Sequence, residues 1–229
     1  MQKKYLPIAL VLIVLLALLA FLGVQALETV PAISLAEEAQ NEVYLTFDDG
    51  PSTVVTERIL DILSEEGVKA TFFIVSDRAY GRESTLKRIV AEGHTVGVHS
   101  ASHDYAKIYA SDEALIEDVQ TCARRIQKIT GVTPTVYRFP GGGSSARERQ
   151  TKLVEGLGYR VVFWNAACGD AEIPHASAEE LCAETIKTSH GKRPVVLLMH
   201  DSASHKATAT ALPHIIAYYK EQGCVFRQF

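Results

Sequence analysis

The chain has 229 residues, 47% of them apolar and 22% charged, which suits one domain with a sizeable core and excludes disordered, collagen-like and repeat proteins. Lys and Arg total 23 against 27 Asp and Glu, so the formal net charge is -4. Nucleic acids are bound by clustered cations, and no basic block occurs beyond the extreme N-terminus, so we expect no nucleic-acid partner.

The first predicted element is an export signal at residues 1–27. Lys3 and Lys4 precede an uncharged run from Tyr5 to Leu27. About 20 apolar residues can span a bilayer as a helix, and a cleaved signal usually has a shorter apolar region, so a retained membrane anchor is favoured. Small residues at 24–26 keep cleavage and secretion open as an alternative. In both cases the rest of the chain is expected outside the cytoplasm, either held at the outer face of the membrane or secreted.

Residues 28–41 are predicted to form a tether, and residues 42–229 a single domain in which short apolar runs alternate with helical periodicity. Strands are predicted at 42–47, 70–75, 95–98, 136–139, 160–163, 195–199 and 224–228. Helices are predicted at 53–66, 83–92, 112–130, 146–157 and 177–188, and a last one is predicted to begin near Pro213 and end at 222. Seven strands with intervening helices predict an α/β fold with a parallel sheet or barrel, here a distorted (β/α)7 barrel of the TIM type.

Four cysteines occur, at positions 122, 168, 182 and 224. Export permits disulfides, and the spacing matches neither a zinc knuckle nor a redox pair. A bond between Cys168 and Cys182 is the favoured pairing, with buried free thiols as the alternative.

Polar or glycine-rich segments follow four of the predicted strands. They are Asp48-Asp49-Gly50-Pro51, His99-Ser100-Ala101-Ser102-His103, Arg138-Phe139-Pro140-Gly141-Gly142 and His200-Asp201. The carboxyl ends of parallel strands meet on one face of a barrel, where active sites are built. The four segments are therefore the candidate active site.

Two histidines and a carboxylate can hold a divalent metal ion and leave positions open for water. His99 and His103 supply the imidazoles, although isolated histidines are commonly structural and Asp-Gly-Pro is also ordinary turn chemistry. Successive side chains on an extended backbone point in opposite directions, which predicts different roles for Asp48 and Asp49. One would bind the metal, and the other would take a proton from metal-bound water.

These segments resemble the motifs of the polysaccharide deacetylase family, the NodB-homology domain of carbohydrate esterases. The run Thr46-Phe47-Asp48-Asp49-Gly50 is similar to the first motif, and His99-Ser100-Ala101-Ser102-His103 to the second. The segments at 138–142 and 197–201 are similar to the third and fifth motifs. The resemblance spans residues 42–228.

The resemblance implies that Asp48 is the general base and His200 the general acid. It also implies a divalent metal, Zn²⁺ or alternatively Co²⁺ or another ion, whose ligands are Asp49, His99 and His103. The family's motifs imply further roles. Arg138 would orient Asp48, and Asp170 would form a hydrogen bond with His200 and raise its pKa. The N–H of Gly141 would face the oxyanion, and Leu198 would line the pocket for the acetyl methyl.

The chain departs from the family at two aromatic positions. The third motif usually has Tyr where Gly141 stands, and the fourth usually ends Asp-Trp where this chain has Asp170-Ala171. Without these rings the sugar groove is expected to be wider or flatter. His175 and His205 follow the fourth and fifth motifs, and they are the remaining histidines most favoured as substrate contacts.

The predicted function is hydrolytic N-deacetylation of N-acetyl sugars in a cell-wall polysaccharide, with peptidoglycan as substrate and a monomer as the enzyme. Chitin, xylan and exopolysaccharide are the alternative substrates. A catalytically idle polysaccharide-binding protein of the same fold is a second alternative. That alternative predicts the loss of Asp48 or His200, and both residues are present. A non-haem iron oxygenase could use a similar metal triad, but it would require a cosubstrate clamp and a different fold.

Overall fold

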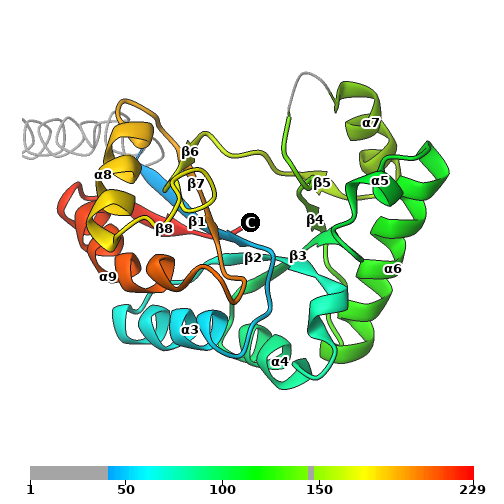
Figure 1. Cartoon of the computed structure of the whole chain (residues 1–229), viewed down its shortest axis with the longest axis horizontal. Helices are drawn as coiled ribbons and strands as arrows, with labels where there is room; N and C mark the ends of the chain where they lie inside the picture. The colour runs from blue at the N-terminus through cyan, green and yellow to red at the C-terminus, as the bar shows by residue number, and fades with distance from the viewer. Residues whose placement is uncertain (1–40, 144–146) are drawn as a thin grey trace, which may run out of the picture. The chain divides into compact units, whose positions relative to one another are not determined.

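A parallel sheet organises the residues that the computed structural model describes, 41–143 and 147–229 (Figure 1). Its strands are β1 (Glu42–Asp48), β2 (Thr71–Val75), β3 (Thr95–Ser100), β4 (Val136–Tyr137), β5 (Arg160–Val161), β6 (Ala166–Ala167), β7 (Val195–His200) and β8 (Val225–Arg227). The strand order is β5-β4-β3-β2-β1-β7-β6, and β8 pairs with the beginning of β1. The central strand β1 therefore lies between β2 and β7, whose ends carry candidate residues to its own end.

The two faces of β1 have different surroundings because side chains alternate along a strand. Val43, Leu45 and Phe47 are fully buried in the main hydrophobic core, together with residues of the helices. On the other face a smaller cluster consists of Phe73, Val136 and Val162, with Val196 and Phe229 packed against it. The helical side of the sheet thus holds most of the apolar packing, and the other side is left for polar groups near the strand ends.

Helices follow most of the strands and cover the outside of the sheet. They are α3 (Val55–Glu66), η1 (Ser76–Ala79), α4 (Glu83–Ala91), α5 (Tyr105–Ile108), α6 (Asp112–Thr130), α7 (Glu148–Gly156), α8 (Ala178–Ser189) and α9 (Lys206–Glu221). Figure 1 shows α3, α4 and α9 along one flank, with α6 and α7 near β3, β4 and β5. The predicted capping box at the start of α8 is confirmed, since Ser177 and Glu180 satisfy each other's backbone N–H groups.

The predicted distorted (β/α)7 barrel is corrected to an open, curled half-barrel of parallel strands. The segment predicted as one strand at 160–163 pairs with β4 only at Arg160 and Val161, and the chain then joins β7 through β6. Between them the side chain of Asn165 accepts a hydrogen bond from Val196 N–H (2.8 Å) and donates one to the Pro194 carbonyl (2.8 Å). An amide side chain thus takes backbone bonds at the edge of β7, and among the described strands β5 and β6 do not pair with each other.

The prediction that the last helix begins near Pro213 is wrong, because α9 begins at Lys206 and contains Pro213 in its interior. Residues 206–211 alternate alanine and threonine after the lysine, so they lack the apolar spacing that marks a helix. Thr208, Ala209 and Leu212 are nevertheless buried. Packing, rather than local pattern, sets the start of this helix.

The predicted disulfide is also wrong, because all four cysteines are free thiols and Cys122 and Cys168 are buried. The predicted export signal at 1–27 and most of the tether lie outside the described residues. In the part of the chain that the structure describes, no helix has the length and apolar character needed to cross a membrane.

Candidate active site

Asp48 and Asp49, at the end of β1, have different partners. Asp48 accepts a hydrogen bond through Oδ1 from Nη1 of Arg138 at 2.9 Å. The Oδ1 atom of Asp49 lies 3.1 Å from Nε2 of His103 and 3.7 Å from Nε2 of His99. The two adjacent carboxylates are thereby separated into one held by a guanidinium and one facing two imidazoles.

Asp49, His99 and His103 offer ligand atoms that all lie within 4.8 Å of one another. Nδ1 of His99 is 2.8 Å from the Arg138 carbonyl, which directs its Nε2 toward the carboxylate. Oδ1 of Asp49 is buried and has no hydrogen-bond partner among the described residues. A buried carboxylate oxygen without a donor, beside two imidazole nitrogens, is a set of atoms that fits a divalent cation.

The backbone is unusual at the same place. Asp49 and His103 have positive φ angles of 80° and 62°, and the other non-glycine residue with positive φ among those described is His175. Such conformations cost on the order of 1–3 kcal/mol for a residue with a side chain. Two of the three strained residues therefore belong to the candidate metal set, where their side chains converge.

Charge and burial set the protonation of this group. Burial alone would raise the pKa of Asp49, but the charges of His99, His103 and Arg78 outweigh it and lower the pKa. Burial lowers the pKa of His99, in spite of the nearby aspartates that oppose this change. An ionised carboxylate and a neutral imidazole are the forms that bind metal ions.

Arg138 is fully buried behind Asp48. Its Nη1 also donates to Oγ1 of Thr46 (2.7 Å), whose hydroxyl donates to the Leu197 carbonyl (2.6 Å). The guanidinium carbon lies 4.2 Å from the centre of the Phe73 ring. A buried ion pair of this kind fixes the direction of the carboxylate, and removing one partner would leave the other charge uncompensated.

His200, at the end of β7, is the register neighbour of Asp48 on β1. Its Nδ1 lies 2.7 Å from Oδ1 of Asp170, and its backbone N–H donates to Oδ2 of the same carboxylate at 2.8 Å. Thr208 also donates to Oδ2, at 2.7 Å. Burial would lower the pKa of His200, but the bond and charge of Asp170, with smaller contributions from Asp48 and Asp49, raise it to about 9.

The glycine-rich segment after β4 is held at both sides of Gly141. Tyr109 donates to the Pro140 carbonyl at 2.8 Å, and Nε of Arg147 donates to the Gly142 carbonyl at 2.6 Å. Gly141 has a φ of 73°, which glycine adopts without a Cβ penalty. Its peptide groups are thus fixed by bonds on either side.

Leu198 pairs in register with Thr46, two residues before the pair of Asp48 and His200. Because side chains two apart on a strand share a face, Leu198 lies on the same face as His200. It is 5% exposed, so most of its side chain is covered.

Three residues at this site were not predicted from the sequence. Nη1 of Arg78 donates to the Asp49 carbonyl at 2.6 Å, Thr46 supports Arg138, and Thr208 supports Asp170. Thr46 stands within the first motif and Arg78 just after the end of β2, and these positions were the available signal. His205, one of the two histidines singled out as substrate contacts, has its ring stacked on His200 with centroids 5.0 Å apart.

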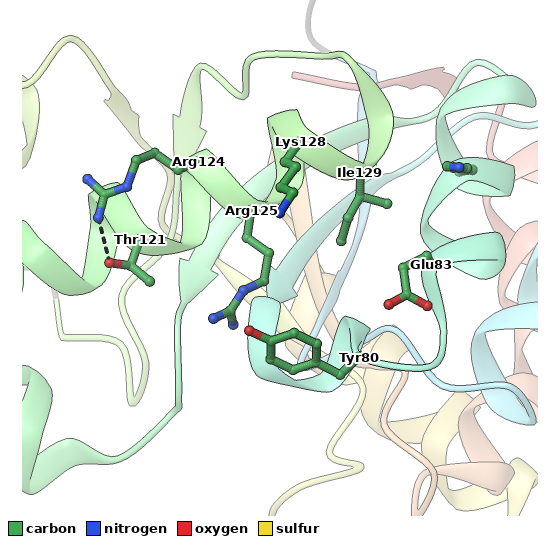
Figure 2. Close-up of a pocket in the computed structure, with 8 residues that line it drawn as sticks. Tyr80, Glu83, Thr121, Arg124, Arg125, Lys128 and Ile129 are labelled. Carbon is green, nitrogen blue, oxygen red and sulfur yellow. Dashed lines mark hydrogen bonds between the residues drawn. The ribbon is translucent and has the colours of Figure 1, made fainter.

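A separate pocket of about 470 Å³ lies near η1, α4 and α6, and none of the predicted site residues lines it (Figure 2). Arg125 stacks over the exposed ring of Tyr80 at 4.4 Å and also pairs with Asp77. Arg124 is bonded to Glu117 at 2.7 Å. The guanidinium groups that line this pocket are therefore partly neutralised. The pocket lies apart from the predicted site residues.

Comparisons with known proteins identify a family model, related sequences and related structures. The sequence model of the polysaccharide deacetylase family matches residues 36–162. YheN of Bacillus subtilis, which carries the family's name, is 35% identical over 80% of this chain, and the chain spans 65% of its length. A peptidoglycan-N-acetylglucosamine deacetylase of Bacillus cereus is 34% identical, with 81% of this chain and 68% of the relative covered.

A solved structure is similar as well. The catalytic domain of peptidoglycan N-acetylglucosamine deacetylase from Eubacterium rectale superposes with a TM-score of 0.75 at 31% identity, covering 82% of this chain and 88% of that one. The chain therefore belongs to the polysaccharide deacetylase family, whose members are hydrolases acting on N-acetyl amide bonds.

Proposed function

We propose that this protein is a metal-dependent N-deacetylase of a cell-wall polysaccharide, with peptidoglycan as its substrate. The observation that carries the proposal is the placement of Asp48 and His200 side by side on β1 and β7, next to Asp49, His99 and His103. The peptidoglycan deacetylases from Bacillus cereus and Eubacterium rectale support this choice of substrate.

Asp49, His99 and His103 would hold a divalent ion, for which Zn²⁺ suits two imidazoles and one carboxylate. Such an ion, when bound, polarises a carbonyl oxygen and lowers the pKa of water. Asp48 takes the proton of the attacking water, since a general base must be ionised and within reach of that proton. Arg138, 2.9 Å from Asp48, fixes the direction of that carboxylate.

His200 donates a proton to the departing sugar nitrogen. Its pKa of about 9, raised by Asp170 against the effect of burial, keeps it protonated near neutral pH. The C–N bond of the acetamide breaks, the nitrogen leaves as an amine, and the acetyl group leaves as acetate. Asp48 thus takes up a proton and His200 releases one in the same reaction.

Gly141 and Leu198 complete the proposed site. The Gly141 N–H, held between two anchored carbonyls, stabilises the oxyanion of the tetrahedral intermediate. Leu198, on the same face as His200, bounds the space for the acetyl methyl. The methyl then meets an apolar side chain while the reacting groups remain polar.

The proposed location is the outer face of the membrane, where the protein is retained as a monomer by residues 1–27. This part of the proposal is based on Lys3, Lys4 and the uncharged run that follows them. Fractionation after expression in a bacterium tests it. Recovery of soluble protein whose N-terminal sequence begins at Leu27 would show cleavage and contradict the anchor.

The experiment that tests the substrate is acetate release by the full-length, metal-loaded protein from purified peptidoglycan, chitin oligomers and acetylated xylan. We expect the highest kcat/KM on peptidoglycan. A clear preference for chitin would replace the substrate. A clear preference for xylan, whose acetyl groups are esters and not amides, would contradict N-deacetylation, and no release from any of the three would contradict the deacetylase proposal.

A further inference from the structure

Tyr105 is an aromatic residue in the site that no motif accounts for. It is the first residue of α5 and follows the candidate ligand His103 by two positions. Its ring centroid lies 5.2 Å from that of His103 and 6.2 Å from that of Tyr109. Although it is packed between these two rings, Tyr105 remains 49% exposed. One part of the ring is therefore held in place, and another part faces solvent beside the candidate metal set.

The position of this ring depends on the absence of a side chain at Gly141. A Cβ placed on Gly141 would lie 3.3 Å from the hydroxyl oxygen and 3.4 Å from the adjoining ring carbon of Tyr105. The first separation is slightly tighter than ordinary van der Waals contact, so a side chain at this position would press against the end of the ring. The end of Tyr105 thus lies over the backbone of Gly141, on the segment that carries the proposed oxyanion N–H.

Hydrogen bonds and a ring contact hold the segments on both sides of this contact. Tyr109 is bonded to the Pro140 carbonyl at 2.8 Å, and the guanidinium of Arg147 lies 3.8 Å from the centre of the Tyr109 ring. At the start of α5, Asp104 caps the helix by accepting a hydrogen bond from Lys107 N–H. Both the helix that carries Tyr105 and the segment it covers are therefore anchored.

We propose that Tyr105 is a substrate-contacting residue, which supplies an aromatic wall against the sugar ring and a hydroxyl that bonds to the sugar beside the reacting acetamide. This inference rests on the proposed function and adds a specificity-determining residue to it. The exposed part of the ring is an apolar surface suited to the C–H face of a pyranose, and the hydroxyl can both donate and accept. A ring from α5 therefore lies beside Gly141, the position at which the family's third motif usually has its aromatic residue.

The test compares Tyr105→Ala, Tyr105→Phe and a matched control, Tyr80→Ala, all in the full-length, metal-loaded protein. Tyr80 is 62% exposed and belongs to the separate pocket (Figure 2), so its loss removes a surface tyrosine outside the site. Acetate release from a chitin tetramer gives kcat and KM. Binding of the same tetramer is measured in an Asp48→Asn background, with the fluorescence of Trp164, the chain's single tryptophan, as the reporter. The Trp164 ring lies against Gly142, where an added Cβ would overlap a ring carbon.

We expect Tyr105→Ala to raise both KM and the dissociation constant by about tenfold, with kcat changed much less. Tyr105→Phe keeps the wall and loses only the hydroxyl, so its increase should be about threefold. Tyr80→Ala should match the unmodified protein. Bound metal is measured in every variant. If Tyr105→Ala loses metal, tetramer binding by Tyr105→Phe and by a Tyr105→Trp variant tests the inference instead.

Two results would overturn the inference. One is unchanged tetramer binding and KM in the Tyr105 variants, and the other is an equal loss in Tyr80→Ala. Failure of the proposed function has a different signature: the unmodified protein would release no acetate from any glycan. In that case the tetramer titration still measures whether Tyr105 contacts sugar, and absent binding by the unmodified protein would reject both proposals.

Discussion

His99 and His200 occupy comparable places, near the ends of β3 and β7, but their surroundings favour opposite protonation states. Burial lowers the pKa of His99, and its Nδ1 faces a backbone carbonyl at 2.8 Å. Asp170 contacts both the ring and the backbone N–H of His200, and it raises the ring's pKa to about 9. The surroundings therefore suit the proposed neutral ligand at one strand end and the proposed proton donor at the other.

The difference lies in the group behind each ring. A carbonyl oxygen orients His99 without adding a full negative charge, whereas a carboxylate stabilises the imidazolium of His200. Thr208 donates to that carboxylate and helps to hold it in position. The surroundings of each histidine, rather than the histidine itself, assign its role.

The largest expected effect comes from removing a ligand on the metal side. His103→Ala should abolish tight metal binding, because it removes one of the three ligand atoms gathered within 4.8 Å. Metal content after dialysis checks this, together with acetate release. A folded variant that retains stoichiometric zinc or cobalt would show that His103 is not a ligand.

The second effect separates the two histidines. His200→Ala should keep its metal, since His200 lies outside the proposed ligand set, but its kcat should fall by at least about a hundredfold, the lower end for general acid–base catalysis. Metal analysis and acetate assays on the same preparation measure both quantities. Loss of metal from this variant would contradict the assignment of His200 as an acid outside the metal-binding residues.

A smaller effect is expected from Asp170→Asn, and it concerns pH. His200 must be protonated to act as an acid, so activity should persist below its pKa of about 9 and fall as the pH rises through it. Removing the carboxylate removes the largest cause that raises this pKa and leaves burial, which lowers it. The alkaline limb of kcat/KM should therefore move to lower pH.

Glu172→Gln is the matched control for Asp170→Asn, because Glu172 is an exposed carboxylate two residues further along the chain. Its pH profile should coincide with that of the unmodified protein. An alkaline limb that stays in place in Asp170→Asn would mean that another group, such as water on a bound metal, sets that limb.

Local sequence predicted the central strands, but it made β5 too long and missed β6 for a physical reason. β2 and β7 are apolar runs with one polar end residue, and β1 and β3 carry buried apolar residues at alternate positions. Both patterns mark strands of a buried sheet. β5 and β6 have two residues each, and β6 pairs with β7 directly after Asn165 bonds to Val196 of that strand. The start of α9 likewise depends on burial of small residues that carry no helical pattern.

The candidate site shows the same division. Residues grouped in motifs at strand ends, such as Asp49 and His103, could be selected from the sequence because parallel strands bring their ends together. The contact of Arg78 with Asp49, and that of Tyr105 with Gly141, join segments with no shared pattern. Such contacts follow from how the loops pack, which the sequence alone does not specify.

The central claim is that Asp48 acts as the base beside a metal ion that it does not bind. The most direct measurement is acetate release by Asp48→Asn and by the unmodified protein, each loaded with the same stoichiometric amount of metal. The account predicts that the variant folds, keeps its metal and loses at least about a hundredfold in kcat. Near-normal turnover by the metal-loaded variant would contradict it.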